Sequence, residues 1–169
     1  INDGAADEFN DLIRGFENKI IGLNFEELYS LTNEQLNQVL ASCPNLEEVN
    51  LSGCYNITDL SGLDECESLQ VLDLSRCIGL NDVSGLGGCK RLKTLNLKYC
   101  TNLMVVSVLG KCKSLQTLHL TYCSNLTNVR ELRGCENLQT LDLSFCYKLT
   151  DVSVLGGCES LQTLKLRRC

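Results

Sequence analysis

The residues of this sequence that could carry out chemistry are few, and their spacing brings them together. His119 is the only histidine, and Asp142 follows it by 23 residues, the period at which the sequence repeats. A histidine beside an aspartate, with the hydroxyl of Ser144 or Thr121 nearby, has the composition of a hydrolytic triad. The sequence predicts no oxyanion hole and no pocket that excludes water. We therefore expect a surface ion pair between His119 and Asp142, in a protein without catalytic activity.

The twelve cysteines are the second group with possible chemistry. They fall in two columns of the repeat, at alternating spacings of 11 and 12 residues, unlike the C-x-x-C spacing of zinc sites. One column is Cys54, Cys77, Cys100, Cys123, Cys146 and Cys169, and the other is Cys43, Cys66, Cys89, Cys112, Cys135 and Cys158. Neighbours in one column would lie about 5 Å apart, within reach of a disulfide. We nevertheless expect unpaired structural thiols, because buried cysteine acts as a small apolar residue with a weak donor.

The repeating unit is the element that must position these side chains. Its first residue is leucine in every copy, at Leu46, Leu69, Leu92, Leu115, Leu138 and Leu161. The pattern L-x-x-L-x-L that follows predicts a short strand with its leucines turned inward, and a short segment then returns the chain to the next strand. Acidic or amide side chains precede this return segment and are predicted to cap one helical or 3₁₀ turn. They are Asp59, Asp82, Asn128 and Asp151. Such a period is typical of a solenoid, in which each repeat contacts only its neighbours.

The chain divides into three parts. Residues 1–19 predict an amphipathic helix that caps the first coil, with a partner-binding helix as the alternative. Residues 20–45 form a longer first repeat, in which Thr32 and Gln35 predict a capping box at the start of a helix. Residues 46–169 hold five repeats of 23 residues and a final half repeat, so we expect a truncated end or an edge buried against another molecule.

The pattern L-x-x-L-x-L-x-x-C across residues 20–169 resembles the leucine-rich repeat, with cysteine where asparagine is commoner. The segment LTNEQLNQVLASCPNLEEVNLSGC is similar to the cysteine-containing repeats of F-box-type leucine-rich proteins. The units of the form LDLSFCYKLTDVSVLGGCESLQTL are most similar to the 23-residue repeats of trypanosomatid leucine-rich proteins, including expression-site-associated leucine-rich/RING proteins described as adenylate cyclase regulators.

The resemblance implies an α/β solenoid: a right-handed leucine-rich repeat superhelix with a concave parallel sheet of about seven short strands and an N-terminal helical cap. It also implies a regulatory or substrate-receptor arm of a larger multidomain protein, such as a ubiquitin ligase or an adenylate cyclase regulator. Neither an F-box nor a RING cysteine pattern occurs in this sequence.

Charge is distributed unevenly along the chain, whose net charge is −6. Residues 1–75 carry 15 of the 21 acidic side chains and only Arg14 and Lys19 as basic ones, so residues 76–169 are basic. Drift of surface charge between repeats accounts for this asymmetry, and a bipolar binding surface is the alternative. Nucleic acid is the weaker expectation for a partner, because the chain is acidic overall.

Side chains that alternate with the leucines point out of the strand face and are free to bind. A column of threonines among them fits β propensity alone. A second column holds Tyr99, Tyr122 and Phe145 between Arg76 and Arg168, and these rings either pack only on one another or anchor a partner. The predicted partner-binding residues are Arg76, Lys98, Tyr99, His119, Tyr122, Asp142, Phe145, Lys165, Arg167 and Arg168.

Together these patterns predict a non-catalytic protein–protein interaction scaffold that binds through its concave strand face. Many unpaired thiols predict a reducing, intracellular location, in the cytoplasm or nucleus. No run of residues has the length and hydropathy of a membrane span, and neither a cofactor nor a metal ion is expected. Self-association through an uncapped C-terminal edge is a further expectation.

Overall fold

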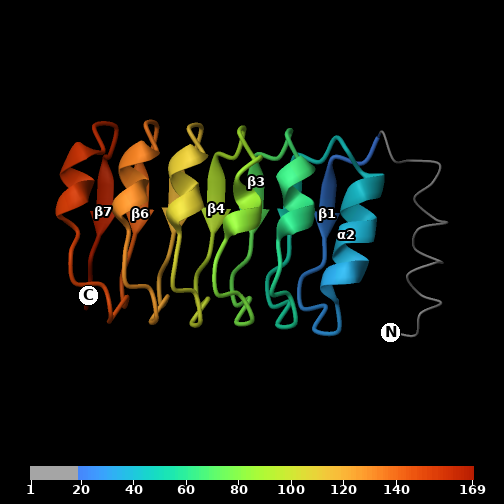
Figure 1. Ribbon diagram of the computed structural model, residues 1–169, viewed down its shortest axis with the longest axis horizontal. Coiled ribbons are helices and arrows are strands. Elements are labelled where there is room, and N and C mark those ends of the chain that lie inside the picture. The colour runs from blue at the N-terminus through green and yellow to red at the C-terminus, as the bar shows by residue number, and fades with distance from the viewer. Residues whose placement is uncertain (1–18) are drawn as a thin grey trace.

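The computed structural model describes residues 19–169, which form a row of similar coils stacked along one axis (Figure 1). Each coil contributes one short strand to a sheet on one side and one helical turn to the other side. The amphipathic helix predicted over residues 1–19 lies outside the described residues, apart from Lys19.

Seven parallel strands form a single sheet in chain order. Their bounds are β1 Gly22–Asn24, β2 Glu48–Asn50, β3 Val71–Asp73, β4 Thr94–Asn96, β5 Thr117–His119, β6 Thr140–Asp142 and β7 Thr163–Lys165. From β2 onward each residue pairs with the one 23 positions later, and β1 pairs with β2 at an offset of 26. The sequence period therefore sets the register of the sheet, and the predicted solenoid is confirmed.

The return segments differ between the first repeat and the others. The longer first repeat builds α2, Asn33–Ser42, which starts with the predicted capping box: Gln35 N–H donates to Thr32 Oγ1, and Thr32 N–H donates to Gln35 Oε1. The 23-residue repeats have room only for 3₁₀ turns. These are η1 Ser61–Glu65, η2 Ser84–Leu86, η3 Ser107–Lys111, η4 Arg130–Gly134 and η5 Ser153–Gly157.

Asx side chains cap four of the five 3₁₀ turns, as predicted. Each accepts a hydrogen bond from the backbone N–H two residues later, at 2.9 Å for Asp59, 2.8 Å for Asp82, 2.7 Å for Asn128 and 2.9 Å for Asp151. The turn that begins at Ser107 is the exception, because Val105 occupies the corresponding position and has no acceptor.

The core is a continuous stack of leucines and cysteines between the sheet and the turns. Eleven of the twelve cysteines are buried, and none of the twelve is in a disulfide. Most of their thiols donate to the backbone of the preceding coil, as in Cys77 Sγ to the Leu51 carbonyl at 3.1 Å and Cys89 Sγ to the Leu63 carbonyl at 3.2 Å. A cysteine therefore fills the space of a small apolar residue while its thiol adds a second, weak hydrogen bond to a carbonyl that already accepts a backbone N–H, as Leu51 does from Cys54.

Candidate binding surface

The strand face presents side chains from successive repeats in straight columns, because neighbouring strands pair in register. His119 lies opposite Asn96 on β4 and Asp142 on β6, and Asp142 lies opposite Lys165 on β7. Two residues after each of these positions, Lys98, Thr121, Ser144 and Arg167 form the next column. The position that follows directly in each repeat forms one more column, which we call the Tyr99 column after its residue in the β4 repeat.

The Tyr99 column has a backbone conformation that side chains rarely adopt. Its residues have φ values of +59° at Glu27, +61° at Arg76, +62° at Tyr99, +63° at Tyr122, +64° at Phe145 and +56° at Arg168, and Gly53 has +76°. The N–H of the following cysteine donates to the carbonyl of the leucine two residues before the column, as in Cys100 to Leu97 at 3.2 Å. This closes a β-turn whose third residue has a positive φ, the place where a type II turn usually has glycine.

The positive φ costs each of these residues roughly 1 kcal/mol relative to an ordinary conformation. The backbone holds them there because the strand ladder runs on through the turn: Tyr99 N–H donates to the Thr121 carbonyl at 2.8 Å, and Tyr122 N–H donates to the Ser144 carbonyl at 2.9 Å. The positive φ therefore belongs to the turn of each repeat, whatever side chain stands there.

The three rings form one stack, as the sequence predicts. The centroids of Tyr99 and Tyr122 lie 4.9 Å apart with an interplanar angle of 11°. Those of Tyr122 and Phe145 lie 4.2 Å apart at 4°, so the three rings are nearly parallel. Tyr147 meets the edge of Phe145 at 6.2 Å. Tyr99 is 42% exposed, whereas Tyr122 and Phe145 are half-buried between their neighbours.

Arginines cover both ends of the stack. The guanidinium of Arg76 lies 5.7 Å from the centroid of Tyr99, and that of Arg168 lies 5.7 Å from the centroid of Phe145. Arg167 lies 5.8 Å from the same Phe145 ring. All three distances are within the range of a cation–π contact. The ring faces at the ends are therefore occupied, and the stack presents ring edges to the solvent.

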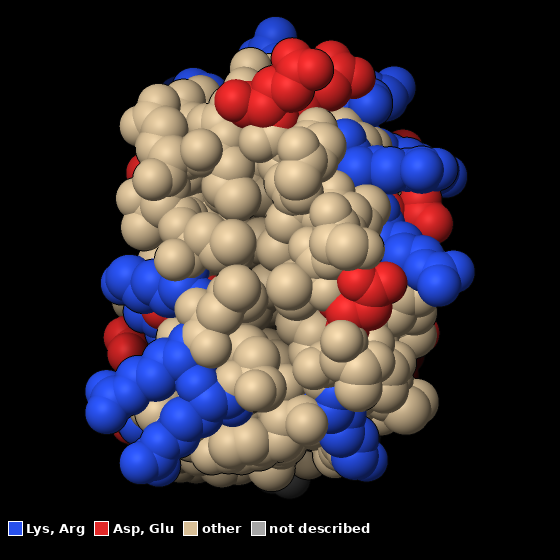
Figure 2. Space-filling model, turned by 90° about the vertical axis from the view of Figure 1, so that its left-hand side faces the viewer, with Lys and Arg blue, Asp and Glu red and all other residues tan. Residues whose placement is uncertain are grey.

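Basic side chains gather toward the β7 end of the strand face. Lys165, Arg167 and Arg168 are all exposed there. Figure 2 views the molecule from this end, where Lys and Arg lie along the sides, Asp and Glu lie at the top and right of the centre, and uncharged surface fills most of the rest. Leu164 and Leu166 of this last coil are 40% and 37% exposed. At the other end of the sheet the exposed residues Glu26, Glu27, Glu47 and Glu48 make the surface acidic.

The predicted ion pair between His119 and Asp142 is wrong. Asp142 Oδ2 pairs instead with Lys165 Nζ at 3.9 Å, and His119 Nδ1 is buried without a hydrogen-bond partner. Partial burial lowers the pKa of His119, and Lys98 lowers it further against the opposing effect of Asp142. His119 is therefore uncharged at neutral pH and adds no positive charge to the strand face.

Asp142 has a structural contact that the sequence interpretation did not anticipate. Its Oδ1 accepts the N–H of Ser144 at 2.9 Å, and the residue is only 8% exposed. Burial alone would raise the pKa of Asp142, but the bonds from Ser144 and the charge of Lys165 outweigh it, and the pKa is lowered. Asn50 and Asp73 make the same bond in their repeats, so this column stabilises the turn. A contact of Asp142 with a partner stays a prediction.

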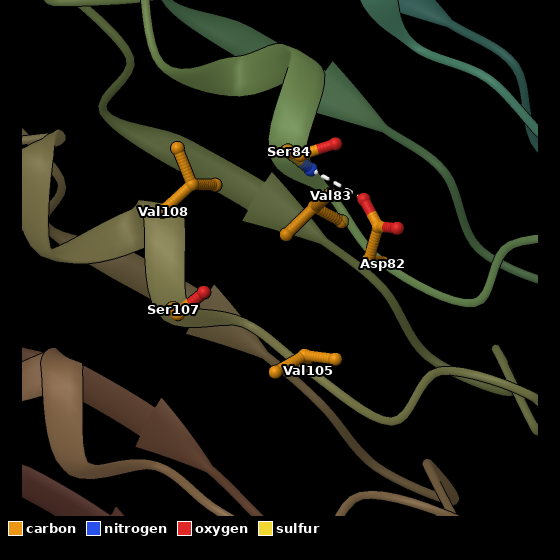
Figure 3. Close-up of a pocket in the computed structure, with 6 residues that line it drawn as sticks. All are labelled: Asp82, Val83, Ser84, Val105, Ser107 and Val108. Atoms are coloured by element: carbon orange, nitrogen blue, oxygen red, sulfur yellow. Dashed lines mark hydrogen bonds between the residues drawn. The ribbon is translucent and has the colours of Figure 1, made fainter.

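The sequence interpretation also missed two hollows. One of about 230 Å³ lies between η2 and η3, where Val105 and Val108 face the Asp82–Ser84 hydrogen bond (Figure 3). The sequence signal for this first hollow was Val105, which stands where the other repeats have Asp or Asn. The other, of about 410 Å³, lies over β1, β2 and β3 on the strand face, where Gly22 has no side chain and Glu48 and Asp73 contribute carboxylates.

Within residues 19–169, no group of three or more His, Cys, Asp or Glu side chains is arranged to hold a metal ion. None of the helices in the same range has the length and apolar character needed to cross a bilayer. The triad considered for His119 lacks a base–carboxylate contact, since Asp142 points to Lys165 and Ser144.

Two segments match models of the leucine-rich repeat: residues 113–157 match a model of two copies, and residues 42–62 match a model of one. Both segments have the strand, turn and return described above. The fold is a leucine-rich repeat solenoid. No curated protein sequence matches the chain.

Solved leucine-rich repeat structures have the same architecture. An internalin, InlF of Listeria monocytogenes, superposes with a TM-score of 0.66 at 20% identity, over 96% of this chain and 55% of that one. A leucine-rich repeat protein of Leptospira interrogans gives 0.65 at 20% identity, over 93% and 45%. TLR13, solved in complex with ssRNA13, gives 0.65 at 21% identity, over 86% and 22%. The chain thus spans about half the length of the internalin, and these likenesses concern the fold alone. Proteins of this fold are generally non-enzymatic binding scaffolds.

Proposed function

We propose that this protein is a non-catalytic scaffold that binds a partner protein through its strand face, with the aromatic stack of Tyr99, Tyr122 and Phe145 as the anchor. The single observation that supports this most is the stack itself, three nearly parallel rings at positions of the turn that would accept glycine. A glycine would occupy the turn without strain, as Gly53 does, yet these positions carry large side chains whose ring edges face the solvent. Aromatic and arginine side chains are also the usual anchors of protein interfaces.

The experiment replaces all three aromatic residues by glycine, which fits the turn, and compares the proteins captured by the variant and by the native chain. A matched control replaces Met104 and Val105 by alanine, because both are exposed apolar residues near η3 on the opposite side. Partners that the glycine variant loses and the control retains support the proposal. An unchanged set of partners with the glycine variant would remove the stack from the binding surface.

The remaining predictions extend this proposal. Resemblance to F-box-type and trypanosomatid leucine-rich proteins supports a role as the regulatory or substrate-receptor arm of a larger protein, such as a ubiquitin ligase or an adenylate cyclase regulator. The buried thiols support a reducing, intracellular location. Exposed Leu164 and Leu166 support self-association through β7, which sedimentation of the chain at increasing concentration would test.

A further inference from the structure

We propose that the partner segment bound by the aromatic stack is an extended acidic peptide, with two carboxylates about four residues apart and an apolar residue midway between them. This inference rests on the proposed function, since it names the chemistry of the partner at that same surface. Three features of the surface support it: the positions of the basic side chains, the orientation of the rings and the small residues between the basic ends.

The basic side chains form two groups, one at each end of the stack. Lys98 and Arg76 lie at the β3–β4 end, and Lys165, Arg167 and Arg168 lie at the β7 end. Lys98 and Arg167 occupy the same column, three strand intervals apart. At the usual spacing of parallel strands this separation is about 14 Å.

The separation matches an extended peptide that runs along the solenoid axis. Such a chain advances about 3.3 Å per residue, so two side chains about four residues apart are about 13 Å apart. In an extended chain, residues that are two or four positions apart point to the same side. The first, third and fifth residues would therefore all face the strand surface, with the outer two at the basic groups.

The stack fits carboxylates and aliphatic groups better than the bases of nucleic acid. An aromatic ring is negative over its face and positive at its edge. The inner ring faces are occupied by neighbouring rings, and the outer faces are covered by Arg76 and Arg168. Stacking of a base needs an open ring face. The edges that remain, beside cationic side chains, favour a carboxylate and can pack against an aliphatic side chain.

The residues between the two basic groups in the Lys98 column are small. They are Thr121 and Ser144, and the rings of Tyr122 and Phe145 stand beside them. Each basic group also keeps charge for a ligand: Lys165 has only a long contact to Asp142, at 3.9 Å, and neither Lys98 nor Arg167 has an ion pair within residues 19–169. An apolar side chain of the partner would thus meet Tyr122 while the acids meet Lys98 and Arg167.

The test measures fluorescence anisotropy of the labelled peptide Ser-Glu-Ser-Leu-Ser-Glu-Ser with the whole chain. Its two controls are the same peptide with Gln for Glu, and the isomer Ser-Ser-Glu-Leu-Glu-Ser-Ser, in which the acids are closer together. We expect the Gln peptide to bind at least about tenfold more weakly, the isomer to bind more weakly than the spaced peptide, and binding of the spaced peptide to weaken as salt is raised.

Variants locate the binding. Lys98→Glu and Arg167→Glu are each expected to weaken binding by about tenfold, and Tyr122→Gly to weaken it as well. Lys111→Glu and Arg133→Glu change the net charge equally but lie in η3 and η4, on the opposite side of the coil, and should leave the affinity unchanged. Circular dichroism of each variant checks that it has folded.

Several outcomes would overturn the inference. The closer-spaced isomer could bind as tightly as the spaced peptide, or the controls in η3 and η4 could weaken binding as much as Lys98→Glu. A single-stranded oligothymidylate could bind more tightly than the peptide and be sensitive to the same variants. If the peptide fails to bind the native chain while the triple-glycine variant still loses its captured proteins, the acidic motif is wrong and the proposed function stands.

Discussion

At the scale of single residues, the same position in successive turns combines a strained backbone with an aromatic stack. Tyr99, Tyr122 and Phe145 adopt φ values near +60°, which a β-carbon disfavours. The stacking between the rings offsets part of this cost, at about 0.5–1.5 kcal/mol for each aromatic pair. The balance between these two effects can be measured at Tyr122, which has a ring on either side.

Replacing Tyr122 by glycine or by alanine separates strain from stacking. Both variants lose the ring, but only glycine removes the steric cost of the positive φ. We therefore expect Tyr122→Gly to have a larger free energy of unfolding than Tyr122→Ala, by about 1 kcal/mol. Urea denaturation of the two variants beside the native chain provides the measurement. Equal stability, or a more stable alanine variant, would mean that the turn does not hold a positive φ in solution.

At the scale of elements, the 3₁₀ turns show what changes when one repeat lacks the Asx residue that the others have. Four of the turns have an Asx side chain that accepts the N–H two residues later, and the turn after Val105 does not. The change also leaves Val105 41% exposed beside the hollow between η2 and η3. An apolar residue has thus replaced a cap at a solvent-exposed position, which costs stability.

Val105→Asn is expected to stabilise the chain by about 0.5–1 kcal/mol, since it restores the cap that Asn128 provides in the next repeat. Val105→Asp should stabilise less, because its charge would lie beside Asp82 in the neighbouring coil. The midpoint of urea denaturation is the readout for both. As a control, Val105→Ala supplies no acceptor and should gain nothing. The capping interpretation would be contradicted if the alanine variant gained as much as the asparagine variant.

At the scale of the whole molecule, the cysteine columns link every coil to its neighbour. Burial raises the pKa of the thiols, to about 11 for Cys66 and Cys112 and about 12 for Cys89, Cys135 and Cys146. The folded chain therefore retains protons that the unfolded chain releases once the pH exceeds the ordinary thiol value near 9. The stability that these thiols contribute is complete below this pH and is lost as the pH rises toward 11–12.

The expected result is cooperative unfolding in alkali. Each such thiol makes the free energy of unfolding fall by about 1.4 kcal/mol per pH unit above pH 9, and several act together. Circular dichroism during a titration with base follows the transition. The variant Cys89→Ser keeps a donor for the Leu63 carbonyl but does not titrate in this range. The free energy of unfolding of this variant should therefore fall less steeply with pH than that of the native chain, by the contribution of one proton.

Two results would contradict this account of the thiols. A chain with a flat stability between pH 9 and 11 would show that the thiols are not buried in their protonated form. Mass spectrometry after alkylation of the denatured, unreduced chain should find labels on all twelve cysteines. Markedly fewer labels would reveal disulfides within the columns.

The sequence by itself determined the repeat, the inward leucines, the two cysteine columns and the register of the strands. The reason is that a fixed period and strict alternation leave one pairing that buries every apolar side chain. The stack of Tyr99, Tyr122 and Phe145 followed from that register. The positive φ of these residues followed only from the structure, although Gly53 in the same column was a signal of it.

Only the tertiary structure decided how the polar residues of the strand face pair. Asp142 contacts Ser144 and Lys165 rather than His119, and His119 is neutral because it is partly buried near Lys98. These outcomes depend on the directions of the side chains and on the charges of three adjacent strands. The aligned repeat sequences do not contain this information. The period fixes which residues are neighbours, and the packed surface decides which of them interact.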